Sequence, residues 1–156
     1  MTSRNGVQVD REDSTVVGPD PILGALVDIV NDARALNADT VTLTLIVNGA
    51  VISGELMPGW RWMKLVDEQL GGSTFLGERA ETLAEEEQRA WAANNPPAEP
   101  WTAERVMTHD PKSQFVHLRN AQIVTGNGDY PPTLWRVRLT DVSGWCYGAL
   151  RTTPAG

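Results

Sequence analysis

Few residues in this chain are of types that carry out chemistry. The sequence holds two histidines, His109 and His117, and one cysteine, Cys146. Their spacing does not match a metal site, in which several such ligands stand close together. His109 precedes Asp110, and a carboxylate beside a histidine can orient a general base. No nucleophile is evident near this pair, so we interpret it as a loop pair and expect no catalytic site there.

The other candidates have ordinary structural explanations. His117 alternates with apolar neighbours, which favours the polar face of a strand over a ligand or a pH-sensitive contact. Cys146 follows Trp145 and is expected to pack as a small apolar side chain. Gly126-Asn127-Gly128 lacks the Lys-Ser/Thr pair and the helix that follow a phosphate-binding loop. The sequence therefore predicts no enzymatic activity, no metal and no cofactor.

Length, net charge and cysteine content limit the kinds of partner that this chain can bind. The chain has 156 residues, enough for one domain with a sizeable core, and a net charge of −7. This charge argues against nucleic acid, which binds basic surfaces. A single cysteine fits a reducing compartment, and no stretch approaches the roughly 20 apolar residues of a membrane span. We expect a cytoplasmic protein that binds neither nucleic acid nor membrane.

The strongest structural signal is a hairpin over residues 41–56, VTLTLIVNGAVISGEL. Asn48-Gly49 suits a two-residue type I′ turn, in which both central residues have positive φ. That turn fixes the register and gives one continuous apolar face, with Leu45 opposite Ile52. The opposite face pairs Thr42 with Glu55, Thr44 with Ser53, and Ile46 with Val51.

The last of these pairs departs from the pattern of its face. The two polar pairs suit contact with water, whereas Ile46 and Val51 are both apolar. We predict that they are covered, either by the helical insertion of the same chain or by a neighbouring molecule.

Helices and further strands are expected around this hairpin. Residues 1–18 are polar and aperiodic, which predicts a flexible tail. Asp20-Pro21 predicts the start of a helix that ends near Asn37. The remaining elements are helices at 60–70 and 76–93, an extended Pro-rich stretch at 94–101, and strands at 114–124, 134–140 and 145–150, with a bulge near Asn120.

Together these elements predict a single α+β domain over residues 19–152. Residues 58–112 would form a helical insertion and a Pro-rich linker between the second and third strands. Short antiparallel strands of this number commonly close into a barrel, which removes exposed edges. We therefore expect a small Sm-like or SH3-like antiparallel β-barrel with an N-terminal helix, a likeness of fold that carries no function.

Three separated segments resemble the gas vesicle accessory protein GvpU family. The first is the run from Asn48 to Gly54, NGAVISG, which follows an N-terminal helix. The matching positions of the other two are Phe115, His117, Leu118, Asn120 and Ala121, and then Trp135, Arg136, Asp141, Val142, Gly144 and Gly148. Val137, Ser143 and Trp145 depart from the family's third pattern. The resemblance covers roughly residues 20–151.

This resemblance implies a non-enzymatic, cytoplasmic, vesicle-associated protein that influences the assembly or clustering of gas vesicles. It would act by contact with itself and with the vesicle shell or other gas vesicle proteins. The candidate contact residues come from the patterns above: Ile46 and Val51 on the hairpin, Glu85, Glu86 and Glu87 on an acidic helix, and Arg136 and Arg138 on one face of a later strand. A run of glutamates such as this one is more often simply a solvated helix face.

A second interpretation belongs to a different class of protein. The chain could be a homo-oligomeric Sm-like or SH3-like module that binds a peptide or protein partner unrelated to gas vesicles. Four of its six tryptophans, Trp60, Trp62, Trp91 and Trp101, lie in the insertion or at its border. They either hold the insertion on the sheet or lie in an interface, where tryptophan and arginine are enriched.

Overall fold

The computed structural model describes residues 18–31, 41–93, 102–124 and 131–150. Its elements are, in chain order, α1 (Pro21–Asn31), β1 (Thr42–Val47), β2 (Ala50–Leu56), α2 (Gly59–Gln69), α3 (Phe75–Ala93), α4 (Ala103–Met107), β3 (Phe115–Ile123), β4 (Thr133–Arg138), the 3₁₀ helix η2 (Leu139–Asp141) and β5 (Val142–Tyr147). This order confirms the α+β fold with helices between the second and third strands. The division into a tail at 1–18 and a single domain at 19–152 stays a prediction.

β1 and β2 form the predicted hairpin in the predicted register. Asn48 and Gly49 have φ angles of 50° and 82°, as a type I′ turn requires. Leu45 pairs with Ile52, and Leu43 lies two residues before Leu45 on the same face. All three side chains are buried, so this face of the hairpin meets the core.

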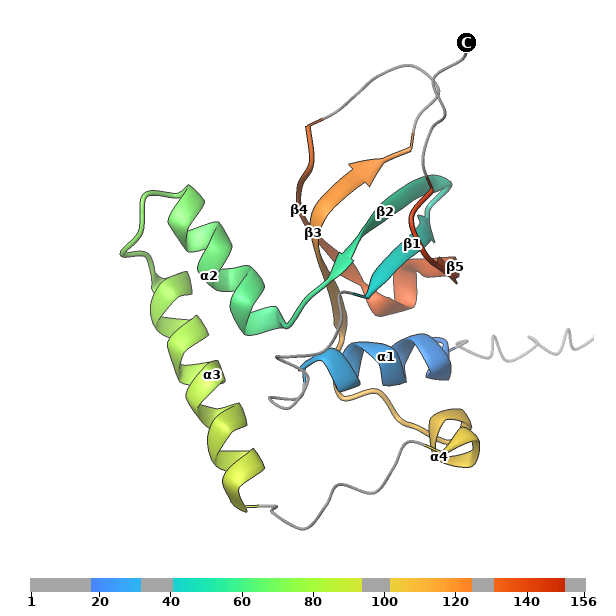
Figure 1. Ribbon diagram of the computed structural model, residues 1–156, viewed down its shortest axis with the longest axis horizontal. Helices are drawn as coiled ribbons and strands as arrows, with labels where there is room; N and C mark the ends of the chain where they lie inside the picture. The colour runs from blue at the N-terminus through green and yellow to red at the C-terminus, as the bar shows by residue number, and fades with distance from the viewer. Residues whose placement is uncertain (1–17, 32–40, 94–101, 125–130, 151–156) are drawn as a thin grey trace, which may run out of the picture.

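The five strands form one antiparallel sheet in the order β4-β3-β2-β1-β5. The hairpin lies at its centre, with β3 paired to β2 and β5 paired to β1 (Figure 1). β4 and β5 lie at the two edges, and no pairing joins them within the described residues. The sheet is open, and the predicted closed barrel is not found.

The sheet is nevertheless curled, because the link between its edge strands is short. Five strands spaced about 4.8 Å apart would hold flat edges about 19 Å from each other. Only η2 separates β4 from β5, and a 3₁₀ helix of that length rises about 6 Å. The chain can pass from one edge to the other only where the sheet bends back on itself. Strand number and curl were predictable, but closure also needs a hydrogen-bonded ladder between the edges, which is not formed.

α1 supplies one side of the core and lies across one end of the sheet (Figure 1). Asp20 caps it, because its Oδ1 accepts hydrogen bonds of 2.9 Å from the backbone N of Ile22 and of Leu23. Leu23, Val27 and Val30 recur at helical spacing and are buried. They join a core cluster that contains Leu43, Leu45, Ile52, Leu56, Val116, Leu118, Ala121, Val137 and Leu139. The predicted end of this helix at Asn37 lies outside the described residues.

β3 carries the predicted irregularity near Asn120. Its register with β4 shifts between Leu118 and Ala121, and Asn120 has a φ of 49°. On the other side of β3, a Cβ at Gly54 would lie 3.0 Å from the Ala121 Cβ. The bulge and the glycine together let β2 and β3 approach closely while both turn around the core.

α2 and α3 form a helical hairpin beside the sheet (Figure 1). α2 packs on β3, and α3 packs on α2. The turn between them is fixed by Asp67, whose Oδ1 accepts from the backbone N of Thr74 at 2.8 Å and from the Thr74 hydroxyl. Gly77 lets α3 approach, since a Cβ there would lie 2.6 Å from the Asp67 Oδ2. We call α2 and α3 with their turn the helical arm.

Two elements differ from the sequence prediction. α4 was not predicted, because its five residues are too short to show helical periodicity; Thr102 caps it by accepting from the Arg105 N at 3.2 Å. β5 begins at Val142 rather than residue 145. Ser and Gly are typical of turns, so the sequence predicts one at Val142-Ser143-Gly144, but pairing of Gly144 with Ile46 of β1 holds this stretch in the sheet.

Gly24 marks the point where α1 meets the segment that leads into β3. A Cβ on Gly24 would stand 2.2 Å from the Pro111 Cγ. We expect Gly24→Ala to lower the free energy of unfolding by about 1–3 kcal/mol, because overpacking outweighs the helix propensity gained. Chemical denaturation measures this, and Gly18→Ala, whose Cβ would meet nothing within 4 Å, is the control. Equal stability of Gly24→Ala and wild type would contradict the packing of Pro111 on α1.

Candidate interaction surfaces

The outer face of the hairpin ends in the apolar pair of Ile46 and Val51. Ile46 is 42% exposed, and Val51 is half-buried. Beside them on β5, Gly144 pairs with Ile46, and a Cβ there would lie 3.5 Å from the Ile46 Cδ1. The helical arm packs on β3 and leaves Ile46 exposed. Of the two covers predicted for this pair, the helical insertion is therefore wrong, and the neighbouring molecule stays a prediction.

The rest of this outer face is covered by the chain itself. Thr44 and Ser53 were expected to meet water, but they are only 3% and 6% exposed. The Thr44 Oγ1 donates to the carbonyl of Gly148 at 2.8 Å and accepts from the N of Leu150 at 3.3 Å. Gly148, with a φ of 103°, turns the chain after β5 across the face. The prediction failed because the covering segment is about 100 residues away in sequence.

Cys146 also lies on this outer face. It pairs with Thr44 and is exposed, whereas Trp145 packs against the core. The prediction of a packed cysteine was wrong, because pairing of Trp145 with the buried Leu45 turns Trp145 inward, and alternation along the strand then turns Cys146 outward. Ile46, Val51, Gly144 and Cys146 form what we call the hairpin-end surface.

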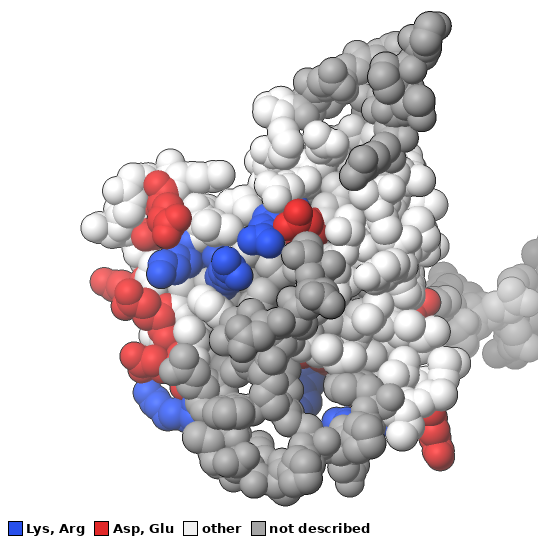
Figure 2. All heavy atoms as spheres, in the orientation of Figure 1, with Lys and Arg blue, Asp and Glu red and all other residues white. Residues whose placement is uncertain are grey.

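α3 carries the predicted acidic face. Glu85 and Glu86 are exposed, as are Glu78 and Glu81, and Figure 2 shows acidic residues gathered along the helical arm. Glu85 forms an ion pair with Arg89 at 3.0 Å. Because both partners are exposed, this pair adds little to stability. The side chain of Glu87 lies outside the described residues.

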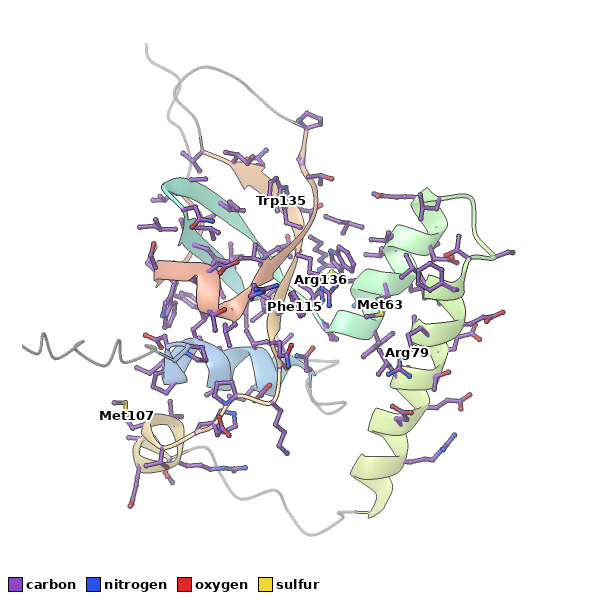
Figure 3. The ribbon with its side chains drawn as sticks, turned by 180° about the vertical axis from the view of Figure 1, so that it is seen from behind. Met63, Arg79, Met107, Phe115, Trp135 and Arg136 are labelled. Atoms are coloured by element: carbon purple, nitrogen blue, oxygen red, sulfur yellow. The ribbon has the colours of Figure 1, made fainter. Side chains whose placement is uncertain are left out.

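β4 carries the predicted basic pair. Arg136 and Arg138 are exposed and lie on one face of the strand, two residues apart. The Arg136 guanidinium stacks over the ring of Phe115 at 3.7 Å, and Figure 3 shows these two side by side on the side of the sheet toward Met63 of α2. The acidic and basic groups lie on separate elements, and no ion pair joins them among the described residues. Both sets were predicted as candidate contact residues, and their part in a contact stays a prediction.

His117 sits where α2 meets the sheet, and sequence reasoning missed its burial. It is only 7% exposed, its ring centroid lies 5.3 Å from that of Trp62, and Gly59 lies directly against it. Among the described residues, neither nitrogen of its ring nor the Trp62 Nε1 has a hydrogen-bond partner, although all three atoms are buried. The expected place on a solvated polar face was wrong, because α2 covers that face of β3. Trp62 thus holds the insertion on the sheet, as one of the two interpretations of the tryptophans predicts.

This environment disfavours the charged form of the His117 imidazole. Burial, with the neighbouring Arg136 guanidinium as a smaller cause, lowers the pKa of His117 from 6.5 to about 4. The ring is therefore neutral near pH 7. Its contact with Trp62 is an aromatic packing contact rather than an ionic one.

His109 pairs with Asp28 of α1 and not with its neighbour Asp110. Its Nε2 lies 2.6 Å from the Asp28 Oδ2, and the same carboxylate accepts from the backbone N of Lys112 and of Ser113. Burial raises the pKa of Asp28, but the hydrogen bonds from Ser113, His109 and Lys112 together lower it below its usual range. In an acyl-transfer triad the histidine stands between serine and carboxylate. Here the carboxylate is the centre of the cluster, and it holds residues 109–113 against α1.

The described part of the chain offers neither a cluster of metal ligands nor a helix suited to a membrane. No group of three or more histidine, cysteine, aspartate or glutamate side chains in it could hold a metal ion. None of its helices combines the length and apolar character needed to cross a membrane.

A comparison with family models identifies the family of this α+β chain. The family described as gas vesicle protein GvpU-like matches residues 20–150 of the 156. The chain therefore belongs to the GvpU-like family of gas vesicle proteins, as its three sequence segments indicated. No curated protein and no solved structure matches it.

The His117 site predicts a specific dependence of stability on pH. The unfolded chain takes up a proton near pH 6.5, whereas the folded chain resists it down to about 4. Stability is therefore full above pH 6.5 and decreases as pH falls toward 4, by up to about 3 kcal/mol. Denaturation of wild type and His117→Phe between pH 7 and 4.5 measures the difference.

The variant should lack most of this slope and should be close to wild type in stability at pH 7, because an apolar ring replaces an unsatisfied polar one. His117→Gln provides a second non-titrating variant if phenylalanine does not fit. A slope between pH 6.5 and 4.5 that is the same in wild type and both variants would contradict the burial of His117.

Proposed function

We propose that this protein is a non-enzymatic gas vesicle accessory protein, cytoplasmic and vesicle-associated. It influences vesicle assembly or clustering through contact with copies of itself and with the shell or other gas vesicle proteins. Membership of the GvpU-like family supports the link to gas vesicles. The observation that carries the contact role is the apolar pair on the hairpin-end surface, in which Ile46 is exposed and Val51 half-buried.

Ile46 stays exposed and Val51 half-buried, whereas the neighbouring polar pair of the hairpin's outer face is buried. Gly148 and Leu150 hydrogen-bond Thr44, which in turn lies 3.2 Å from the Ser53 hydroxyl. Removing the exposed part of an isoleucine and a valine from water would contribute about 1–2 kcal/mol to binding. An apolar centre with polar residues around it is the usual composition of a contact surface.

Asp28 and His109 form the cluster that most resembles a catalytic site, but their hydrogen bonds support a structural role. Asp28 accepts hydrogen bonds from two backbone amides in addition to its contact with His109. Its place at the centre of the cluster makes it a structural group that fixes a loop on α1. We therefore assign Asp28 and His109 to the fold.

The open sheet favours a second candidate function. Among the described residues, β4 and β5 each have an unpaired edge at which a peptide can add as a strand. The chain would then serve as a homo-oligomeric binding module for a peptide or protein partner unrelated to gas vesicles. Binding of the purified protein to gas vesicles separates the two functions, since only the first requires it.

The hairpin-end surface is tested by Ile46→Thr combined with Val51→Thr. Threonine keeps the β-branch that suits a strand and removes apolar surface. We expect about 5- to 30-fold weaker binding to purified gas vesicles, measured by co-flotation, or weaker self-association, measured by sedimentation. The matched control is Leu70→Thr combined with Phe75→Thr, two residues 64% and 76% exposed at the turn of the helical arm. Unchanged flotation and sedimentation of the hairpin variant would remove this surface from the contact.

A further inference from the structure

The outer edge of β4 presents main-chain groups and charged side chains together. β4 is an edge strand that pairs only with β3 among the described residues. The N of Leu139 donates to the O of Gln114 at 2.8 Å, and the register continues with Val137 opposite Val116. In an antiparallel pair, every second residue turns its main chain toward the partner strand. The main-chain N–H and C=O groups of Trp135 and Val137 therefore point toward β3.

The alternate residues turn their N–H and C=O toward the free edge. These residues include Arg136 and Arg138, whose side chains are exposed on the outer face of the strand. The stacking of Arg136 over Phe115 at 3.7 Å holds that guanidinium in one place. On the same face of β3, Arg119 is already paired with Glu55 at 2.6 Å. Within the described residues, neither arginine of β4 has a carboxylate partner.

We propose that the β4 edge binds an extended segment of a partner protein with carboxylates at alternate positions. The segment would add as a sixth strand, with its main chain paired to Arg136 and Arg138. Residues directly opposite in such a pair have Cβ atoms about 5 Å apart, so two carboxylates on one face of the segment would each meet one arginine. Main-chain hydrogen bonds supply the strand addition, and the charges select the partner.

The edges of a second copy fit this site poorly. A second β4 would place arginine against arginine, which is destabilising. β5 has a free edge, but Val142–Tyr147 contains no carboxylate. The glutamates of α3 have the right charge, yet the main chain of a helix is already hydrogen-bonded within itself. Among the described residues, no free strand edge carries carboxylates. We therefore assign the site to an acidic extended segment of another protein.

The acidic segment would be the partner of the β4 edge, and this assignment rests on the proposed function of the protein in making contacts. The probe is a short labelled peptide in which glutamate alternates with valine, and its glutamine counterpart is the control. Binding to the full chain is measured by fluorescence anisotropy. Combining Arg136→Gln with Arg138→Gln should weaken binding of the glutamate peptide about 5- to 30-fold and should leave the glutamine peptide's weak binding unchanged.

Two further variants separate strand addition from general attraction. Arg61→Gln combined with Lys64→Gln removes the same charge from exposed positions of α2 and should leave binding unchanged. Arg138 has a φ of −68°, which proline adopts, so Arg138→Pro removes an edge N–H without strain. It should bind the peptide more weakly than Arg138→Gln does.

Three results would overturn the inference: no binding of the glutamate peptide, equal loss in the α2 variant, or equal affinity of Arg138→Pro and Arg138→Gln. A change in the sedimentation of Arg138→Pro without any peptide binding would assign the edge to a second copy, and this too would overturn it. Co-flotation with gas vesicles is scored separately. Persistent flotation with failed peptide binding removes only this inference, whereas lost flotation with intact peptide binding removes only the vesicle role.

Discussion

The type I′ turn at Asn48-Gly49 is the constraint on which the rest of the sheet depends. It fixes the pairing of β1 with β2, and these two strands carry β5 and β3 at their outer sides. A slip of one residue would turn Leu43, Leu45 and Ile52 out of the core and would disrupt the packing of α1. The same register decides which residues of the hairpin remain outside. The apolar interior and the position of Ile46 and Val51 on the outer face are thus two consequences of a single turn.

Distant segments of the chain cover some parts of the outer face of this sheet and leave other parts exposed. The helical arm covers β3 around His117, and the segment from Gly148 to Leu150 lies against Thr44. Ile46 and Cys146 of the hairpin-end surface and the arginines of β4 stay exposed. Although the chain has a net charge of −7, the uncovered parts of this face are apolar around Ile46 and basic at Arg136 and Arg138, and an exposed acidic face lies on α3. Covering by distant segments, rather than strand pattern, therefore sets where a partner can bind.

Local signals made part of this structure predictable. The turn at Asn48-Gly49, the cap at Asp20 and the bulge at Asn120 each depend on residues within a few positions, and all three were predicted correctly. The burial of His117 and Thr44 depends on segments far away in the chain, so alternation in sequence misplaced both. The prediction of a closed barrel failed because closure depends on pairing between the two edge strands, which local sequence patterns do not determine. The sequence identified Ile46 and Val51 because they interrupt the polar pattern of their face. That β4 is an edge strand is known only from the strand order of the sheet.

Hydrogen–deuterium exchange on the full chain, with and without purified gas vesicles, tests most directly whether the hairpin-end surface is where this protein makes contact. Bound vesicles should slow amide exchange over residues 46–51 and 142–146, with little change in α1. Slowed exchange confined to α3, or none at the hairpin end while the protein floats with the vesicles, would show that the contact lies elsewhere.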